Sequence, residues 1–228
     1  MVSTTPPKRT QMRRREESQA RILDASIKLL VEYGYDRFSI QKVGRSAGCS
    51  YELVNHYFGN KEGLLVALAQ HIIDKLRADT FRTTELSHGF AGLSQRIRFF
   101  TEAAFRDYLT FRAYMIIAAE APSRPLLSTF VLQVREQTLA SLLQALKNAQ
   151  LAAEIRKDID TKEYAEMIYD FLRGHANIVL LTYSGELEEA GGRPTRSGSV
   201  ELFVSLLEHA LDPRLETRPH ASQKLAPG

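Results

Sequence analysis

Apolar residues recur at helical spacing along almost the whole chain, and no segment shows the strict alternation expected of a half-buried strand. The spacing predicts a first helix over Glu16–Tyr33, ended by Gly34. Two short helices follow, each after a serine that can cap it, Ser39 and Ser50, and a longer helix begins at Lys61. Further helices are predicted over 92–108, 111–120, 125–150, 161–184 and 197–211. The pattern therefore predicts an all-α protein.

The length of 228 residues allows one large domain or two unequal ones, and either could bury a core. With 44% apolar and 25% charged residues, the chain has the composition of a globular protein. The composition shifts and turn residues predict a basic flexible arm over 1–15, a small helical domain over 16–62, a larger helical domain over 63–212 and a mobile tail over 213–228.

No apolar run comes near the roughly 18 residues that a membrane span needs, and the N-terminus lacks the apolar stretch of a signal peptide. We therefore expect a cytoplasmic protein without a membrane segment. Cys49 is the only cysteine, which excludes an intramolecular disulfide and a CxxC metal site. It is interpreted as a small buried residue at a bend, with a reactive thiol as the alternative.

The positive charge is concentrated at the N-terminal end. The net charge is +3, but residues 1–62 hold eleven Lys or Arg against seven Asp or Glu, and the remainder holds nineteen against twenty. Five basic residues precede the first acid, Glu16; they are Lys8, Arg9, Arg13, Arg14 and Arg15. Such an arm suits a polyanion, and a solvated tail without a partner is the alternative.

The stretch SAGCSYELVNHYFGNKE, residues 46–62, places a glycine turn between two short helices. A helix of about eight residues is roughly 12 Å long, which is close to the width of the B-DNA major groove. A preceding helix and a tight turn are what a helix-turn-helix unit uses to hold the second helix across that groove. Short helix pairs also occur in all-helical proteins that bind no nucleic acid.

The run FSIQKVGRSAGCSYELVNHYFGNKEGLL, residues 38–65, resembles the DNA-binding signature of the TetR family of bacterial transcriptional regulators. The AGCS turn, the aromatic pair Tyr57 and Phe58, and the NKE start of the next helix stand in the family's register without a gap. The resemblance extends back over the first helix and covers about 50 residues. It implies an N-terminal three-helix helix-turn-helix DNA-binding domain followed by a larger helical ligand-binding and dimerisation domain.

The resemblance also implies roles for individual residues. The base-reading positions are Gln41, Tyr51, Glu52 and Asn55, and the phosphate-binding positions are Ser39, His56, Tyr57 and Lys61. Val43, Val54 and Phe58 should point inwards. Leu53 and Asn55 depart from the family pattern, which removes two hydroxyl groups. Asn55 can instead pair with adenine. Leu53 either touches a thymine methyl group or packs against the first helix, and Glu52 either accepts from cytosine or is simply exposed.

The larger domain is rich in aromatic residues, with six between positions 99 and 114. Such density is typical of a core, but the resemblance implies an effector pocket there, for an apolar or amphipathic molecule. The candidate pocket residues are Phe105, Arg106, Tyr108, Tyr114, Arg173 and His175. The last two helices look like a pair that forms a four-helix homodimer interface, with candidate residues Ile168, Leu172, Val179, Phe203, Leu206 and Leu207, although such helices could equally belong to a monomer core.

The sequence thus predicts a ligand-responsive repressor that binds a palindromic operator as a dimer and is released by a small effector. An enzyme is the first alternative, but the chain has no HExxH, GxSxG, Walker or dinucleotide-binding motif, so we expect no catalytic residues, metal or cofactor. A helical protein-binding adaptor is the second alternative, and it would leave the basic arm and the signature in residues 38–65 without a purpose.

Overall fold

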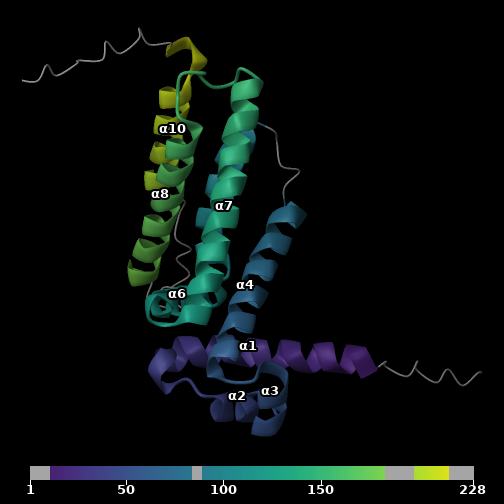
Figure 1. Ribbon diagram of the computed structural model, residues 1–228. Helices are drawn as coiled ribbons and strands as arrows, with labels where there is room; N and C mark the ends of the chain where they lie inside the picture. Colours follow the sequence, from purple (N-terminus) through teal and green to yellow (C-terminus); the bar gives the residue numbers. More distant parts are fainter. Residues whose placement is uncertain (1–10, 84–88, 183–197, 216–228) are drawn as a thin grey trace, which may run out of the picture. The chain divides into compact units, whose positions relative to one another are not determined.

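The computed structural model describes residues 11–83, 89–182 and 198–215, and within these ranges the secondary structure is entirely helical (Figure 1). The all-α prediction is confirmed. The helices are α1 (Gln11–Arg37), α2 (Ile40–Ser46), α3 (Tyr51–Phe58), α4 (Lys61–Thr83), α5 (Gly89–Arg106), α6 (Tyr108–Glu120), α7 (Pro125–Leu151), α8 (Thr161–Thr182) and α10 (Gly198–Leu211), with short 3-10 turns at Ala121–Ser123 and Pro213–Leu215.

Several predicted helix ends differ from the structure by a few residues, among them the start of α1 and the break between α5 and α6. The regular geometry of α1 is interrupted at Gly34 (φ 69°, ψ 177°), as predicted, but α1 begins at Gln11, five residues before the predicted start. The break between α5 and α6 lies at Asp107, earlier than expected, because the Asp107 carboxylate accepts a hydrogen bond from the Thr110 N–H at 3.3 Å and caps α6 there.

The described helices divide into two compact units. The first comprises the described parts of 1–83 and 106–135, so it contains α1 to α4, α6 and the start of α7. Within it α1 packs on α2, α4 and α6, and α3 packs on α2 and α4. Its fully buried side chains come from all these elements and include Leu30, Phe38, Val43, Val54, Leu64, Leu68, Phe111, Ile117 and Leu127.

The second unit comprises the described parts of 84–105 and 136–228, and it contains α5, the rest of α7, α8 and α10. One apolar core joins these four helices, and its members include Leu93, Ile97, Leu146, Ile168, Leu172, Val204 and Leu207. Asp160 caps the start of α8, since its Oδ1 accepts from the Lys162 N–H at 2.8 Å. Of the predicted arm and tail, residues 1–10 and 216–228 lie outside the described residues, whereas 11–15 belong to α1 and 213–215 to a 3-10 turn.

No helix in the described ranges is long and apolar enough to cross a membrane.

Candidate nucleic-acid interface

The short helices α2 and α3 are fixed by two serine caps and two buried valines. Ser39 Oγ accepts from the Lys42 N–H at 3.4 Å, and Ser50 Oγ accepts from the Leu53 N–H at 3.2 Å. Gly48 makes the turn between the helices with a φ of 67°. Val43 and Val54 are fully buried, as expected of them. Because each cap satisfies the first turn of its helix, the pair presents α3 in one defined orientation.

The outer face of α3 is polar and open. Tyr51 is 42% exposed, and Glu52, Asn55 and His56 are exposed as well. Gln41, on α2, is also exposed. The structure therefore brings all four predicted base-reading residues to the surface of one helix pair, where they remain exposed among the described residues.

Glu52 is tied to the start of its own helix. Hydrogen bonds from its own backbone N–H and from the Ser50 hydroxyl lower the pKa of Glu52. A carboxylate in the first turn also interacts favourably with the positive end of the helix dipole. These contacts support a role for the Glu52 carboxylate in stabilising the first turn of α3.

Two apolar side chains near the turn are less buried than predicted, and a third, Leu53, for which the sequence left two alternatives, is partly exposed. Cys49 is only partly buried, although the sequence predicts a buried residue at this bend. Phe58 is half-buried, and its ring meets that of Tyr57 edge-on, with centroids 6.2 Å apart. Leu53 is half-buried too. On this two-turn helix Val54 is the one buried residue, and Leu53 and Phe58 stay partly exposed beside the core.

The predicted phosphate-binding residues differ in their surroundings. His56 is exposed and Tyr57 half-buried, and their rings lie 5.6 Å apart. Ser39 is half-buried and uses its hydroxyl oxygen as a cap. Lys61 departs most from the prediction, since its Nζ donates to the Tyr35 carbonyl oxygen at 2.6 Å and lies 3.8 Å from the centre of the Tyr35 ring. Partial burial, together with the nearby positive charge of Arg124, lowers the pKa of Lys61.

Tyr35 holds two cations. Besides Lys61, Arg124 stacks on its ring, with Cζ 4.0 Å from the centre, and donates a hydrogen bond from Nε to the Tyr35 hydroxyl oxygen. Arg124 also pairs with Glu120 at 3.2 Å. Tyr35 thus joins the end of α1, the start of α4 and the turn between α6 and α7, all within the first unit.

Substitutions of Tyr35 should separate these contacts. Tyr35→Phe keeps the ring but removes the hydroxyl that Arg124 binds, so we expect the free energy of unfolding to fall by about 1 kcal/mol. Tyr35→Leu also removes the π face used by both cations, and we expect a further loss of about 1 to 2 kcal/mol. Urea unfolding measures both values. Equal losses in the two variants would show that the cations gain nothing from the ring.

Gly63, in the first turn of α4, has no room for a side chain. A Cβ placed there would lie 2.2 Å from the Phe58 carbonyl oxygen. Helix propensity alone predicts that Gly63→Ala stabilises the helix by roughly 1 kcal/mol. The clash is with backbone, so we expect the reverse, a loss of at least about 2 kcal/mol in the free energy of unfolding.

Ala67→Gly, one turn further along α4, is the reference variant for this experiment. Helix propensity alone should lower its free energy of unfolding by about 1 kcal/mol. Chemical denaturation of both variants makes the comparison. A Gly63→Ala protein that is as stable as the wild type would mean that the start of α4 can relax without cost.

Two cations that the sequence did not assign to the interface also lie beside aromatic rings. The Arg15 guanidinium carbon is 5.7 Å from the centre of the Tyr57 ring. Lys42 Nζ donates to the Arg37 carbonyl oxygen at 3.0 Å and lies 4.4 Å from the Tyr33 ring centre. Arg15 was identified only as part of a basic arm, because helical spacing says nothing about a contact between residues so far apart in the chain.

The structure does not gather the predicted effector-pocket residues within one unit. Arg106, Tyr108 and Tyr114 belong to the first unit, whereas Arg173 and His175 belong to the second. Tyr114 is buried and Arg106 exposed. His175 stacks on Phe171 with centroids 5.9 Å apart, and burial lowers its pKa. The side chain of Phe105 lies outside the described residues.

The predicted dimer residues fall into two groups. Four of them, Ile168, Leu172, Val179 and Leu207, are at most 4% exposed and lie inside the protomer. Phe203 is half-buried and stacks on Phe171 with centroids 3.7 Å apart, and Leu206 is 59% exposed. A contact surface on α8 and α10 must therefore be built from other residues than those four.

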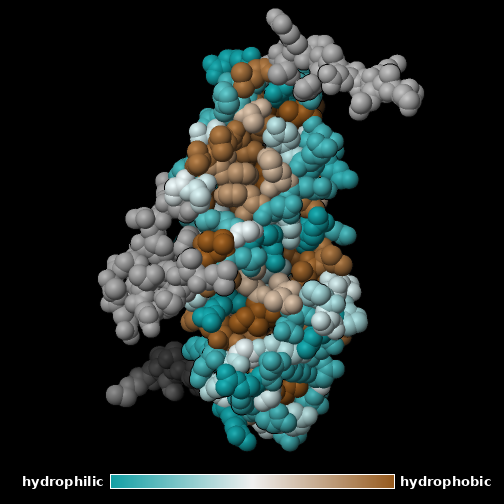
Figure 2. Space-filling view, turned by 90° about the vertical axis from the view of Figure 1, so that its left-hand side faces the viewer, coloured by the Kyte–Doolittle hydropathy of each residue, from teal (hydrophilic) through white to brown (hydrophobic). Residues whose placement is uncertain are grey.

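The same two helices also carry exposed apolar side chains. Met167 (44% exposed) and Ile178 (59%) lie on α8, and Leu202 (60%) lies with Leu206 on α10. Figure 2 views the side of the second unit on which α8 and α10 lie, and it shows hydrophobic residues gathered on that face. We call Met167, Ile178, Leu202 and Leu206 the α8–α10 patch.

Comparison with known proteins finds a family match within the first four helices. Residues 22–68 match the model described as bacterial regulatory proteins, tetR family. The HTH-type transcriptional regulator BetI of Burkholderia thailandensis is 37% identical over 68 residues, which are 30% of this chain and 35% of that protein. The BetI of Burkholderia cenocepacia is 35% identical over the same shares of the two chains. The chain thus matches about a third of the length of these curated relatives.

Solved structures show the same fold over most of the chain. A TetR-family transcriptional regulator from Rhodococcus sp. superposes with a TM-score of 0.71 at 17% identity, over 86% of this chain and 100% of that one. GusR of Salmonella enterica gives 0.67 at 22% identity, over 90% and 98%. The predicted arrangement of an N-terminal helix-turn-helix followed by a helical domain is therefore confirmed as the fold.

Proposed function

We propose that the whole protein is a transcriptional regulator of the tetR family of bacterial regulatory proteins, whose model residues 22–68 match, and that it binds a palindromic DNA operator as a homodimer in the cytoplasm. The observation that carries this proposal is the polar, uncovered face of the capped helix α3. The helix of eight residues is roughly 12 Å long and fits the major groove.

In the proposed complex, α3 lies in the major groove with Tyr51 and Asn55 towards the base edges. The Asn55 amide can accept from adenine N6 and donate to N7, and Gln41 on α2 can do the same at a neighbouring base pair. His56 and Tyr57 follow on the same helix and would meet the flanking phosphates. Lys61, held by Tyr35, is proposed to position the start of α4 and not to bind a phosphate through its own ammonium group.

The homodimer is proposed to form through the α8–α10 patch. Residues 167 and 178 recur on one face of α8, and 202 and 206 on one face of α10. The Phe171–Phe203 stack joins the two helices, so the patch has a firm base. A two-fold dimer doubles the number of bases read, which a single short recognition helix needs in order to find one site in a genome.

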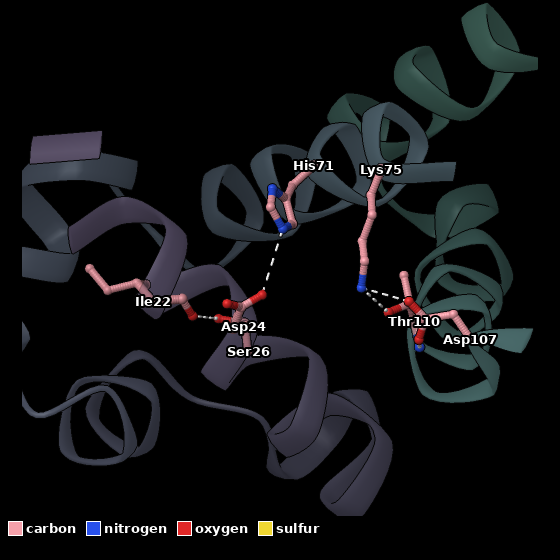
Figure 3. Close-up of polar contacts among 7 residues, drawn as sticks. All are labelled: Ile22, Asp24, Ser26, His71, Lys75, Asp107 and Thr110. Atoms are coloured by element: carbon pink, nitrogen blue, oxygen red, sulfur yellow. Dashed lines mark hydrogen bonds and ion pairs between the residues drawn. The ribbon is translucent and has the colours of Figure 1, made fainter. Parts of the chain in front are cut away.

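A small, largely apolar or amphipathic effector is proposed to release the DNA by shifting α4. Besides the Lys61 contact with Tyr35, two further polar contacts hold α4 in the first unit, and Figure 3 shows these two. His71 Nε2 lies 3.7 Å from Asp24 Oδ1 on α1, and Lys75 Nζ donates to Asp107 Oδ2 at 2.6 Å. Partial burial works to raise the pKa of Asp107, but hydrogen bonds from Lys75 and Thr110 outweigh it and hold that pKa below its usual range.

These contacts matter for release because a moving α4 must break or lengthen them. An effector therefore has to favour the shifted position by a few kcal/mol to act as a switch. The proposed activity is binding alone, without a catalytic step.

The proposal is tested by selecting duplexes from a random pool with the full chain. The expected product is a set of sequences with two inverted half-sites, whose affinity falls steeply as salt is raised. Enrichment of no sequence, together with no duplex binding at low salt, would reject the regulator and favour a helical protein-binding adaptor.

A further inference from the structure

The first ten residues of α1, Gln11–Ala20, form a helix end that is exposed at seven positions and only partly buried at 17–19. None of them is buried, and the first buried position is Ile22. Ten helical residues span roughly 15 Å. Figure 1 shows this end of α1, in purple, projecting beyond α2 and α3. A polar helix end without a core contact gains little from the fold itself, so another contact is needed to explain its orientation.

One side of this helix end is joined to the recognition helix. The guanidinium carbon of Arg15 lies over the ring of Tyr57, on α3, 5.7 Å from the ring centre. The opposite side is occupied by an exposed ion pair between Arg13 Nε and Glu17 Oε1, at 3.3 Å. Residues two apart on a helix are separated by about 200°, so Arg13 and Arg15 point in nearly opposite directions.

We propose that Arg15, oriented by the Tyr57 ring, is a further phosphate contact on the DNA strand that borders the groove occupied by α3. This inference rests on the proposed function. The guanidinium is planar, permanently charged and able to grip a phosphate with two parallel hydrogen bonds. The contact with Tyr57 places the guanidinium beside a side chain that is itself proposed to bind a DNA phosphate. Arg15 and Tyr57 would therefore contact the same stretch of the DNA backbone.

The contact with the Tyr57 ring orients the Arg15 side chain before it meets DNA. A long, flexible side chain loses rotamer freedom when it binds a phosphate, and a ring that already holds the guanidinium reduces that loss. Arg13, in contrast, lies on the opposite side of the helix, where the carboxylate of Glu17 pairs with it and offsets its charge. The chain therefore contains a contact residue and its matched control two positions apart.

The test compares Arg15→Gln with Arg13→Gln, using the operator obtained by selection. Each variant removes one positive charge from the same helix end. Because each protomer of the dimer contributes one Arg15, the slope of log Kobs against log[salt] should become shallower by roughly 2 in Arg15→Gln. The affinity at 0.1 M salt should fall by roughly 10- to 100-fold, and equally for operator and random duplexes. Arg13→Gln should keep the wild-type slope.

The same slope in both variants, whether changed or unchanged, overturns the proposal. A Tyr57→Leu background tests the role of the ring, since Arg15→Gln should cost less affinity there than in the wild type, and additive losses would refute the orienting contact. Circular dichroism confirms that the variants fold alike. If the wild type binds no duplex at low salt, it is the proposed function that fails, which is a different result.

Discussion

The double variant Tyr51→Ala/Asn55→Ala should lose operator recognition while it keeps the fold. Each well-placed side chain contributes about 1 to 3 kcal/mol of discrimination at its base pair, and a dimer presents each of them twice. We therefore expect operator affinity to fall by roughly 1,000-fold, to near the value for random DNA. The salt slope should stay unchanged, since the phosphate contacts remain. Titration of labelled operator at several salt concentrations measures both quantities.

The matched control is Gln144→Ala/Asn148→Ala. These two side chains form another exposed pair four residues apart, on α7, and hydrogen bond to each other at 2.8 Å. Both double variants should change the free energy of unfolding by less than about 1 kcal/mol, because exposed side chains contribute little to stability. Operator affinity of Tyr51→Ala/Asn55→Ala within about threefold of the wild type would mean that another surface reads the bases.

The double variant Leu202→Glu/Leu206→Glu should separate the protomers. Both leucines are about 60% exposed in the single chain, so the fold tolerates a carboxylate there. In the proposed dimer the patch is covered, and burying unpaired charges is costly enough to prevent association. We expect a monomer at concentrations where the wild type is dimeric, and operator affinity lower by roughly 100-fold or more because only one half-site is read at a time.

Leu151→Glu is the control for this variant. Leu151, at the end of α7, is 86% exposed but lies outside the α8–α10 patch, so this variant should remain dimeric. Sedimentation velocity gives the oligomeric state, and the operator titration gives the affinity. A dimeric Leu202→Glu/Leu206→Glu protein would move the interface to another face of the chain.

Local features of this fold were predictable from the sequence because they depend on neighbouring residues. The caps formed by Ser39 and Ser50 and the break at Gly34 each follow from the chemistry of one residue and the next few. The extra turns of α1 before Glu16 were not predictable in this way. They have no buried side chain, so they leave no apolar periodicity in the sequence.

Contacts between helices were less predictable. Periodicity shows that one face of α8 is apolar, but it cannot tell whether that face meets the protomer's own core or a partner. Ile168 and Leu172 proved to be core, and the exposed apolar residues lie beside them. The ring contacts of Tyr35 and Tyr57 join segments far apart in the sequence, and no spacing rule links residue 124 to residue 35, or residue 57 to residue 15.

The membership of α6 in the first unit has a consequence for the order in which the protein is made. Phe111 and Ile117 fill the core against α1 and α4, although residues 84–105, which belong to the other unit, come before them in the chain. Chains emerge from the ribosome N-terminus first, at about 5 to 20 residues per second. Helix α3, the proposed recognition helix, is therefore synthesised early but packs on an incomplete core, which is complete only once synthesis has passed residue 135. A nascent or truncated chain that ends sooner carries the proposed base-reading residues on a unit that still exposes its apolar interior.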